Sequence, residues 1–332
     1  MAGKRIRAAV IGVGYLGRFH AQKYQQHSGV DLVGVVDSNA ERAKEVAAEV
    51  GTQAYSSYAD LQDKVDIVSI AVPTHLHHAV ARQCLQAGCH ILLEKPVTKT
   101  LAEADELIKL ADERGLVFQV GHLERFNPAV LALKGVLKEP MFIESHRMAA
   151  FKTRGTDINV VLDLMIHDID ILLSMVGYPL KTITPIGVPV LSGKIDIANA
   201  RLQFANGCVA DVTASRVSLT PMRKIRIFQQ DAYISIDYLK RKIAIFRKNP
   251  GSNMIPGLPN ISLEERSFEQ RDALKDEIDS FVASVCNGTP QVVTGEDGRR
   301  ALAVALEISS KIRQVVKEYE KRQLIDPDPF PG

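Results

Sequence analysis

Apolar and polar positions alternate in a regular rhythm over roughly the first 120 residues. Short apolar runs typical of buried strands lie at 5–11, 32–36, 66–72, 89–93 and 117–120. Segments with helical spacing of apolar positions lie between them, at 16–27, 40–50, 75–87 and 100–114. This alternation predicts a parallel sheet with helices on both faces. Right-handed crossovers then bring the carboxyl ends of all the strands to one edge.

The rhythm changes after Gly121. Strand-like runs then follow one another, at 141–151, 182–190, 195–204, 208–217, 224–229, 232–238 and 242–247. Helices are expected at 128–137, 160–175, 268–286 and 295–319, a loop at 249–259 and an extended arm from 326 onward. We therefore expect an α/β domain, residues 1–122, followed by an α+β domain, residues 123–332, with an open and mostly antiparallel sheet.

Composition narrows the class of protein. The length of 332 residues predicts two domains, and 46% hydrophobic residues allow sizeable cores. A net charge of +2 argues against a nucleic-acid or membrane-surface protein, and no apolar run approaches the roughly 18 residues of a membrane span. The N-terminus does not match a signal peptide. The four cysteines lack CxxC spacing, so we expect buried thiols in a cytoplasmic protein.

A glycine motif follows the first apolar run. Gly12, Gly14 and Gly17 form GxGxxG where a strand should give way to a helix, and Asp37 follows 20 residues after Gly17. The glycines permit a tight turn, approach of a pyrophosphate and close helix packing, so we expect residues 12 and 14–17, including Tyr15 and Leu16, to contact a dinucleotide. Asp37 would bind the ribose hydroxyls and favour NAD, although Arg42 could instead help to hold a 2′-phosphate. A purely structural glycine turn is the alternative.

A histidine-rich stretch, Pro73-Thr74-His75-Leu76-His77-His78, follows the third strand at the same sheet edge. Pro73, Thr74, His75 and His78 are expected to line the cofactor. Helix capping is the alternative. A metal site is disfavoured because no carboxylate or cysteine completes a ligand set nearby.

Glu94-Lys95-Pro96 follows the next strand and therefore faces the same edge. The Lys95 ammonium could hydrogen-bond a substrate hydroxyl and stabilise developing alkoxide charge. The alternative is a surface lysine paired with Glu94.

Asp163, His167 and Asp170 share one face of an otherwise apolar helix, at i, i+4 and i+7. A histidine one turn from a carboxylate suits a general base whose tautomer is fixed by its neighbour. The alternative is a core histidine in a structural ion pair.

The GxGxxG motif, Glu94-Lys95-Pro96 and Asp163-x-x-x-His167, in this order, resemble the Gfo/Idh/MocA oxidoreductase family. The resemblance covers nearly the whole chain. It implies a Rossmann domain, NAD as cofactor, a second domain used for substrate binding and homo-oligomerisation, and catalysis by Lys95, Asp163 and His167. Glu94, Lys95 and His122 complete the residues expected to contact the cofactor.

Within that family, the run from Gly121 to Pro128 resembles the branch that oxidises the 3-hydroxyl of UDP-N-acetylglucosamine. That activity feeds an aminotransferase and the synthesis of lipid A or surface glycans. Residues 159–161 also lack the glycines usual in inositol dehydrogenases.

The resemblance suggests hydride transfer from sugar C3 to the nicotinamide, with His167 taking the proton, Asp163 orienting His167 and Lys95 holding the oxygen. Candidate substrate contacts besides these three residues are Asn127 and, for the diphosphate, Arg125, Arg147 and Arg154. A free sugar or inositol as substrate, and a non-catalytic NAD-binding regulator, remain as alternatives.

Overall fold

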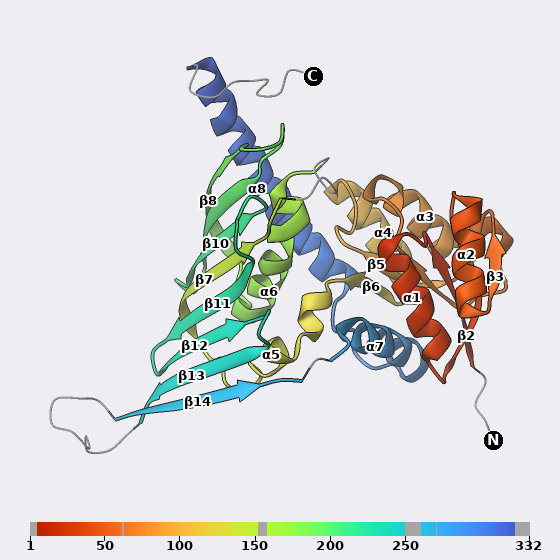
Figure 1. Ribbon diagram of the computed structural model, residues 1–332, viewed down its shortest axis with the longest axis horizontal. Coiled ribbons are helices and arrows are strands. Elements are labelled where there is room, and N and C mark those ends of the chain that lie inside the picture. The colour runs from red at the N-terminus through yellow and green to blue at the C-terminus, as the bar shows by residue number, and fades with distance from the viewer. Residues whose placement is uncertain (1–4, 62, 152–157, 250–259, 270, 323–332) are drawn as a thin grey trace. The chain divides into compact units, whose positions relative to one another are not determined.

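The computed structural model describes residues 5–61, 63–151, 158–249, 260–269 and 271–322. The chain divides into two compact units, and each unit is built from two segments. The first unit holds the chain up to Phe126 and the segment Asp272–Leu302; the second holds Asn127–Arg271 and the chain from Ala303 onward. Each unit contains one sheet (Figure 1).

Six parallel strands form the sheet of the first unit, in the order β3-β2-β1-β4-β5-β6. The strands are β1 (Ile6–Ile11), β2 (Val30–Val36), β3 (Gln53–Tyr55), β4 (Ile67–Ile70), β5 (His90–Glu94) and β6 (Phe118–Gly121). The helices are α1 (Tyr15–Gln26), α2 (Ala40–Val50), η1 (Tyr58–Leu61), α3 (Thr74–Gln86), α4 (Leu101–Glu113) and η2 (Leu123–Phe126). This order is that of dinucleotide-binding α/β domains, so the predicted fold class is confirmed for this unit.

Local sequence explains where these elements begin and end. The Asn39 side chain accepts hydrogen bonds from the backbone N–H groups of Glu41 and Arg42 at the start of α2. Thr100 and Glu103 form a reciprocal capping box at the start of α4. The central strand β1 has no exposed surface at Ala8, Ala9 and Val10, as expected for a parallel strand covered on both faces.

A segment from late in the chain completes the first unit. Helix α7 (Ala273–Asn287) packs against α1, and its Ile278, Phe281 and Val282 join the apolar core around β1 and β2. The predicted boundary at residue 122 leaves this helix in the second domain, whereas the structure gives it to the first unit. The sequence could not show this, because amphipathic spacing marks a buried face without naming the partner that covers it.

The start of α8 (Gly295–Lys321) belongs to the same unit. A Cβ atom at Gly295 would lie 2.7 Å from the Phe118 ring, and one at Gly298 would lie 2.8 Å from the Val120 side chain. The two glycines therefore let this helix approach β6 closely.

Eight strands form the sheet of the second unit, in the order β14-β13-β12-β11-β7-β10-β9-β8. All neighbours are antiparallel except β7 and β10, which confirms the predicted mostly antiparallel sheet. The strands are β7 (Pro140–Met148), β8 (Leu180–Val188), β9 (Ile197–Phe204), β10 (Val209–Ser215), β11 (Met222–Gln229), β12 (Ala232–Asp237), β13 (Lys242–Lys248) and β14 (Ile261–Ser267).

Helices cover one face of this sheet. Helix α6 (Ile166–Val176) packs on β7 and β10, and the part of α8 after Leu302 lies against β8, where Lys311 donates to the Ile183 carbonyl at 2.8 Å. The short α5 (Pro128–Leu131) ends sooner than the predicted helix at 128–137. The sequence pattern does not predict the edge strands β3 and β14, because β3 has three residues and β14 is mostly polar. The predicted loop and C-terminal arm lie almost wholly outside the described residues.

Candidate active site

The glycine loop after β1 has the shape that the motif requires. Gly12 has a φ of 84°, and a Cβ atom there would lie 2.8 Å from the Ala71 carbonyl. A Cβ atom at Gly17 would lie 1.8 Å from the Gly12 carbonyl oxygen, so α1 can start this close to the loop only with glycine. At Gly14 an added Cβ meets nothing within 4 Å. Gly12 and Gly17 thus shape the loop, while Gly14 offers open backbone at the start of α1, as a pyrophosphate site needs.

Asp37 stands beside this loop at the end of β2. Its Oδ2 accepts from the Val13 backbone N–H at 2.9 Å, and its Oδ1 accepts from the Asn39 N–H at 2.9 Å. These bonds fix the carboxylate next to the glycines, as expected for a ribose ligand. Arg42 Nη1 lies 3.6 Å from Asp37 Oδ1. A cation so close lowers the repulsion between Asp37 and a 2′-phosphate.

The three clustered histidines of α3 have different surroundings. His75 is exposed, and His78 Nε2 lies 2.9 Å from a carboxylate oxygen of Glu106 on α4. His77 is buried between two backbone carbonyls, with Nδ1 2.9 Å from the Pro96 oxygen and Nε2 2.8 Å from the Val72 oxygen. Pro73 precedes the first residue of α3, Thr74. His77, which the sequence pattern does not single out, therefore connects the loop after β4 to the Glu94-Lys95-Pro96 turn.

Lys95 follows the last residue of β5, at the carboxyl edge of the sheet, and is partly buried. The Glu94 carboxylate accepts from the Lys95 backbone N–H at 3.3 Å and pairs with His20 Nε2 at 3.1 Å. Burial acts to raise the pKa of Glu94, but the bond to His20 and the nearby Lys95 charge hold it below its usual value. Glu94 is thus anchored from the protein interior. His122 is also buried and directly follows β6.

Asp163 and His167 belong to the second unit. Asp163 lies in η3 (Val161–Met165), a π-helical turn that runs into α6 at Ile166. The predicted helix at 160–175 is therefore not α-helical in its first turn. Both side chains are partly exposed and one turn apart, as expected, whereas Asp170 is buried. Single π-helical turns inside helices are frequent at functional sites.

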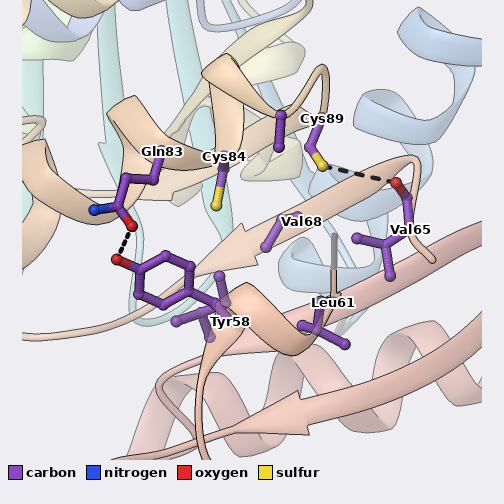
Figure 2. Close-up of a pocket in the computed structure, with 9 residues that line it drawn as sticks. Tyr58, Leu61, Val65, Val68, Gln83, Cys84 and Cys89 are labelled. Carbon is purple, nitrogen blue, oxygen red and sulfur yellow. Dashed lines mark hydrogen bonds between the residues drawn. The ribbon is translucent and has the colours of Figure 1, made fainter. Parts of the chain in front are cut away.

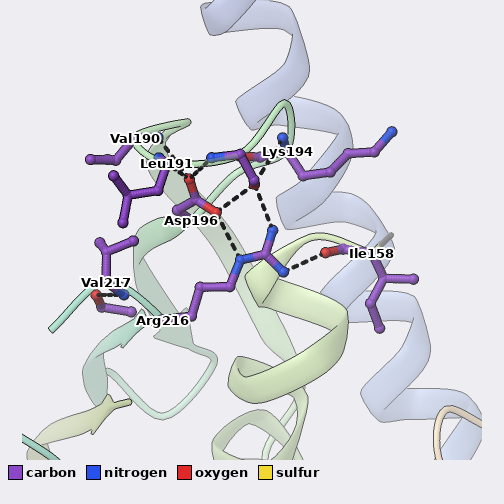
Figure 3. A network of polar contacts seen from close by, with 9 residues as sticks. Ile158, Val190, Leu191, Lys194, Asp196, Arg216 and Val217 are labelled. Atoms are coloured by element: carbon purple, nitrogen blue, oxygen red, sulfur yellow. Dashed lines mark hydrogen bonds and ion pairs between the residues drawn. The ribbon is translucent and has the colours of Figure 1, made fainter. Parts of the chain in front are cut away.

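A buried ion pair anchors the start of this helix (Figure 3). Asp196 accepts from the backbone N–H groups of residues 190–192 and from Arg216 Nε at 2.8 Å. Arg216 also donates to the Ile158 carbonyl at 2.7 Å, just before η3. Burial opposes ionisation of Asp196, but the Ser192 hydroxyl, which donates to its Oδ1 at 2.6 Å, together with these donors brings its pKa to about 2.

Further bonds hold the same turn. The Asn159 side chain accepts from the Leu162 N–H at 3.0 Å and donates to Ser309 of α8 at 3.2 Å. Asp168, next to His167, forms a two-bond pair with Arg147 of β7, at 2.7 and 3.1 Å. These contacts set the direction in which η3 and α6 present Asp163 and His167.

The candidate substrate-binding residues differ in burial and in the contacts they make. Arg147 is 2% exposed and pairs with Asp168, which does not suit its place among the candidate cations for a substrate diphosphate. Arg125 is partly buried, 3.7 Å from Asp297. The Asn127 side chain accepts from the Ala129 N–H at 3.0 Å and so caps α5. Arg154 lies outside the described residues.

A family model described as an oxidoreductase family with an NAD-binding Rossmann fold matches residues 6–122. The chain is 44% identical over 304 residues to a UDP-N-acetylglucosamine 3-dehydrogenase of Acidithiobacillus ferrooxidans, across 91% of this chain and 96% of that protein. A solved structure of that organism's enzyme, GnnA, matches with a TM-score of 0.87 at 42% identity, across 93% of this chain and 98% of the other. The scyllo-inositol 2-dehydrogenase (NAD(+)) of Bacillus subtilis is 28% identical, across 93% of this chain and 94% of that protein.

The chain belongs to the Gfo/Idh/MocA family. As a member of this family it is an NAD-dependent oxidoreductase, as the sequence motifs predict. The glycine loop and Asp37 fit this cofactor, because one offers open backbone at a helix start and the other an anchored carboxylate. Among the described residues, no helix is both long and apolar enough to cross a membrane.

The first unit of this Gfo/Idh/MocA protein also contains a small cavity of about 20 Å³ (Figure 2). Apolar side chains, two cysteines, Tyr58 and Gln83 line it, and Cys89 lies 3.6 Å from the Val65 carbonyl. It has little more than the volume of one water molecule, so it is not the cofactor site. Cys84, Cys89 and Cys208 are buried free thiols as predicted, and burial raises the pKa of Cys208 to about 11, but Cys286 is exposed.

Proposed function

We propose that the protein oxidises the 3-hydroxyl of a UDP-N-acetylglucosamine-type nucleotide sugar to the 3-keto sugar. The observation that carries this proposal is the 44% identity, over 91% of the chain, to a relative with that activity in its name. The inositol dehydrogenase is also matched over nearly its full length, but at 28% identity. Asn159 supports the same choice, because its side chain bonds help to build the helix start where inositol-type members usually have glycines.

We assign the proton transfer to His167. Bound NAD supplies the acceptor for the hydride. The His167 imidazole takes the hydroxyl proton, and Asp163, one turn earlier, orients the imidazole and stabilises its cation. Lys95 holds the reacting oxygen through its ammonium and offsets the charge that develops there. The anchored strand end at Glu94 and the anchored helix start at Ile158 support these roles, because catalytic groups need fixed positions.

We assign cofactor contacts to the glycine loop and Asp37, and further ones to Pro73, Thr74, His75, Glu94, Lys95 and His122. His78 keeps a place in this set, although its ring nitrogen already contacts Glu106. Arg125 and Arg154 are the proposed cations for the substrate diphosphate. Asn127, whose side chain caps α5, is a proposed substrate contact.

The test is an assay of purified protein with NAD and UDP-N-acetylglucosamine, in which absorbance of reduced nicotinamide is followed. A sugar aminotransferase with its amino donor is added to trap the ketone. UDP-N-acetylgalactosamine, free N-acetylglucosamine and myo-inositol form the comparison panel, and the H167A variant is the control. Turnover of inositol or a free sugar, without turnover of the UDP-sugar, would overturn the substrate proposal. NAD binding without turnover of any of them would instead favour a regulator.

We further propose that the protein forms a homo-oligomer through the sheet face opposite α6. Ile143, Ser145 and Arg147 of β7 are buried on the α6 side, so the alternate residues face away from it. That outer face carries a row of rings across four strands: Phe142, Phe228, Tyr233 and Phe246, with neighbouring centroids 5.0–5.7 Å apart. Phe228 and Phe246 remain 36% and 37% exposed, which suits an apolar contact with a second copy.

Sedimentation analysis tests this proposal. Phe228→Glu should shift the protein to a smaller species, whereas Lys109→Glu, on the exposed surface of α4, should not. An unchanged assembly in the Phe228→Glu protein would count against this face. We also propose a cytoplasmic location, because both substrates, NAD and the UDP-sugar, are cytoplasmic metabolites. A partner aminotransferase that consumes the ketone belongs to the same proposal.

A further inference from the structure

A chain of polar side chains lies buried behind the Glu94-Lys95-Pro96 turn, within the first unit. The Tyr24 hydroxyl lies 2.8 Å from Ser69 Oγ, which lies 3.1 Å from His20 Nδ1. His20 Nε2 in turn lies 3.1 Å from Glu94 Oε1. Tyr24, Ser69 and His20 are at most 1% exposed. Because buried polar groups cost free energy unless they are bonded, these contacts hold the four side chains in place.

The Glu277 side chain of α7 lies close to His20 and Glu94. It has no exposed surface, and neither of its carboxylate oxygens has a hydrogen-bond partner among the described residues. One ligand atom each of His20, Glu94 and Glu277 lies within 4.8 Å of the others. Two carboxylates this close, away from water, destabilise each other's ionised form, which favours a proton on one of them.

The surroundings decide which carboxylate is ionised. The ionised form of Glu94 is stabilised by His20, by the Lys95 backbone N–H and by the nearby Lys95 charge. The groups that face Glu277 are Glu94 of β5, His20 and Tyr24 of α1, and the uncharged Gln119 of β6, whose amide donates to the Glu277 carbonyl. Burial, and then the Glu94 charge, raise the pKa of Glu277 well above its ordinary value.

Charged neighbours on the remaining side are already engaged. The short helix η2 also packs on α7 and carries Glu124 and Arg125, and Arg125 pairs with Asp297 at 3.7 Å. These surroundings favour the anionic form of Glu94 and the neutral form of Glu277.

We propose that Glu277 is a positioning residue: as a neutral acid it donates its proton to the Glu94 carboxylate and so fixes the strand end that carries Lys95. With His20 on one oxygen and the Lys95 N–H on the other, this donor completes the set of groups around Glu94. Gly121 provides the space, because a Cβ atom there would lie 3.0 Å from Glu94 Oε2. The proposal rests on the proposed role of Lys95 in the reaction.

Infrared spectroscopy tests the proton without any assay of activity. The difference spectrum between the wild type and E277Q, recorded near neutral pH, should show the carbonyl stretch of a protonated carboxylic acid, lost in the variant. D279N is the matched control, since Asp279 lies on the same helix at the surface and pairs with Lys275. If the band is missing from the wild type, Glu277 is ionised and the proposal fails. One tightly bound metal ion per chain, measured by elemental analysis, would overturn it too, because a ligand carboxylate carries no proton.

Kinetics tests the positioning. E277L removes the donor but stays neutral, and we expect kcat to fall by roughly tenfold or more with the Kd of NAD unchanged, because a small misplacement of a reacting group is costly. E277Q keeps a neutral donor and should restore most of kcat. Its activity should also extend to higher pH than that of the wild type, because glutamine does not lose a proton as the pH rises. Wild-type turnover by E277L, or equal damage in both variants, would overturn the proposal. Absence of wild-type turnover with the UDP-sugar is a different result: it refutes the substrate, and the variants are then compared on the panel sugar that is oxidised.

Discussion

Replacement of Asp196 by Asn should weaken the protein in a manner that depends on pH. Asp196 has no exposed side-chain surface and pairs with Arg216, which is 6% exposed. Its pKa of about 2, against the ordinary 3.8, corresponds to roughly 2 kcal/mol of stability. Because the folded-state pKa is the lower one, this contribution is complete above the ordinary pKa and is lost as the pH falls through 3.8 towards 2.

At neutral pH the variant should lose more, about 3 to 5 kcal/mol, since Arg216 is left as an uncompensated buried charge. Urea unfolding from pH 7 down to the acid limb, followed by circular dichroism, measures both effects. The wild type should lose stability with acid over this range more steeply than D196N. Asp211→Asn, which breaks the exposed pair with Arg201, is the control and should cost at most about 1 kcal/mol. Parallel acid limbs for the wild type and D196N would refute the reasoning, as would a stability at pH 7 equal to that of the wild type.

Three further predictions concern the site. His167→Ala should lower kcat by about 10²- to 10⁴-fold, as for loss of a general base, while the Kd of NAD, measured by calorimetry, stays the same; unchanged turnover would remove His167 from the mechanism. Asp37→Ser should weaken NAD more than NADP, because a ribose ligand is lost and Arg42 is freed from its pairing with Asp37, and an unchanged ratio of the two Kd values would contradict the assignment of Asp37. His77→Ala should lower kcat more than it changes the KM for NAD, because the Pro96 carbonyl loses its contact next to Lys95; the same kcat as in the wild type would show that this contact does not position the turn.

The sequence predicted the glycine loop and the spacing of the Asp163–His167 pair because each depends on residues close together in the chain. The glycines and Asp37 predict a strand, a turn and a helix within one short stretch, and the structure has each of them with the expected geometry. Asp163 and His167 share a helix face for the same reason. The contacts that hold the start of the π-helical turn were not predictable, since Ile195 and Arg216 bind it from other parts of the second unit.

Contacts between distant parts of the chain could not be inferred. His20, Glu94 and Glu277 are separated by many residues, and nothing in the pattern around Glu277 distinguishes it from a surface acid on an amphipathic helix. The same holds for Arg147: its sequence position shows that a cation is present, but not that this cation pairs with Asp168. His77 went unnoticed because its partners are backbone carbonyls, which carry no sequence signal.

The segment Asp272–Leu302, which belongs to the first unit, is synthesised late, so it determines when that unit can complete its core. Domains generally fold from the N-terminus as they leave the ribosome. Here Ile278 and Phe281, 1% and 0% exposed, fill the core around β1 and β2, and they are synthesised only after the whole eight-stranded sheet. The core of the nucleotide-binding unit therefore stays open until all strands of the second unit have been synthesised, and the segment from Ala303 that completes the second unit follows later still. Truncation anywhere before α7 leaves an exposed apolar surface and not a smaller working domain.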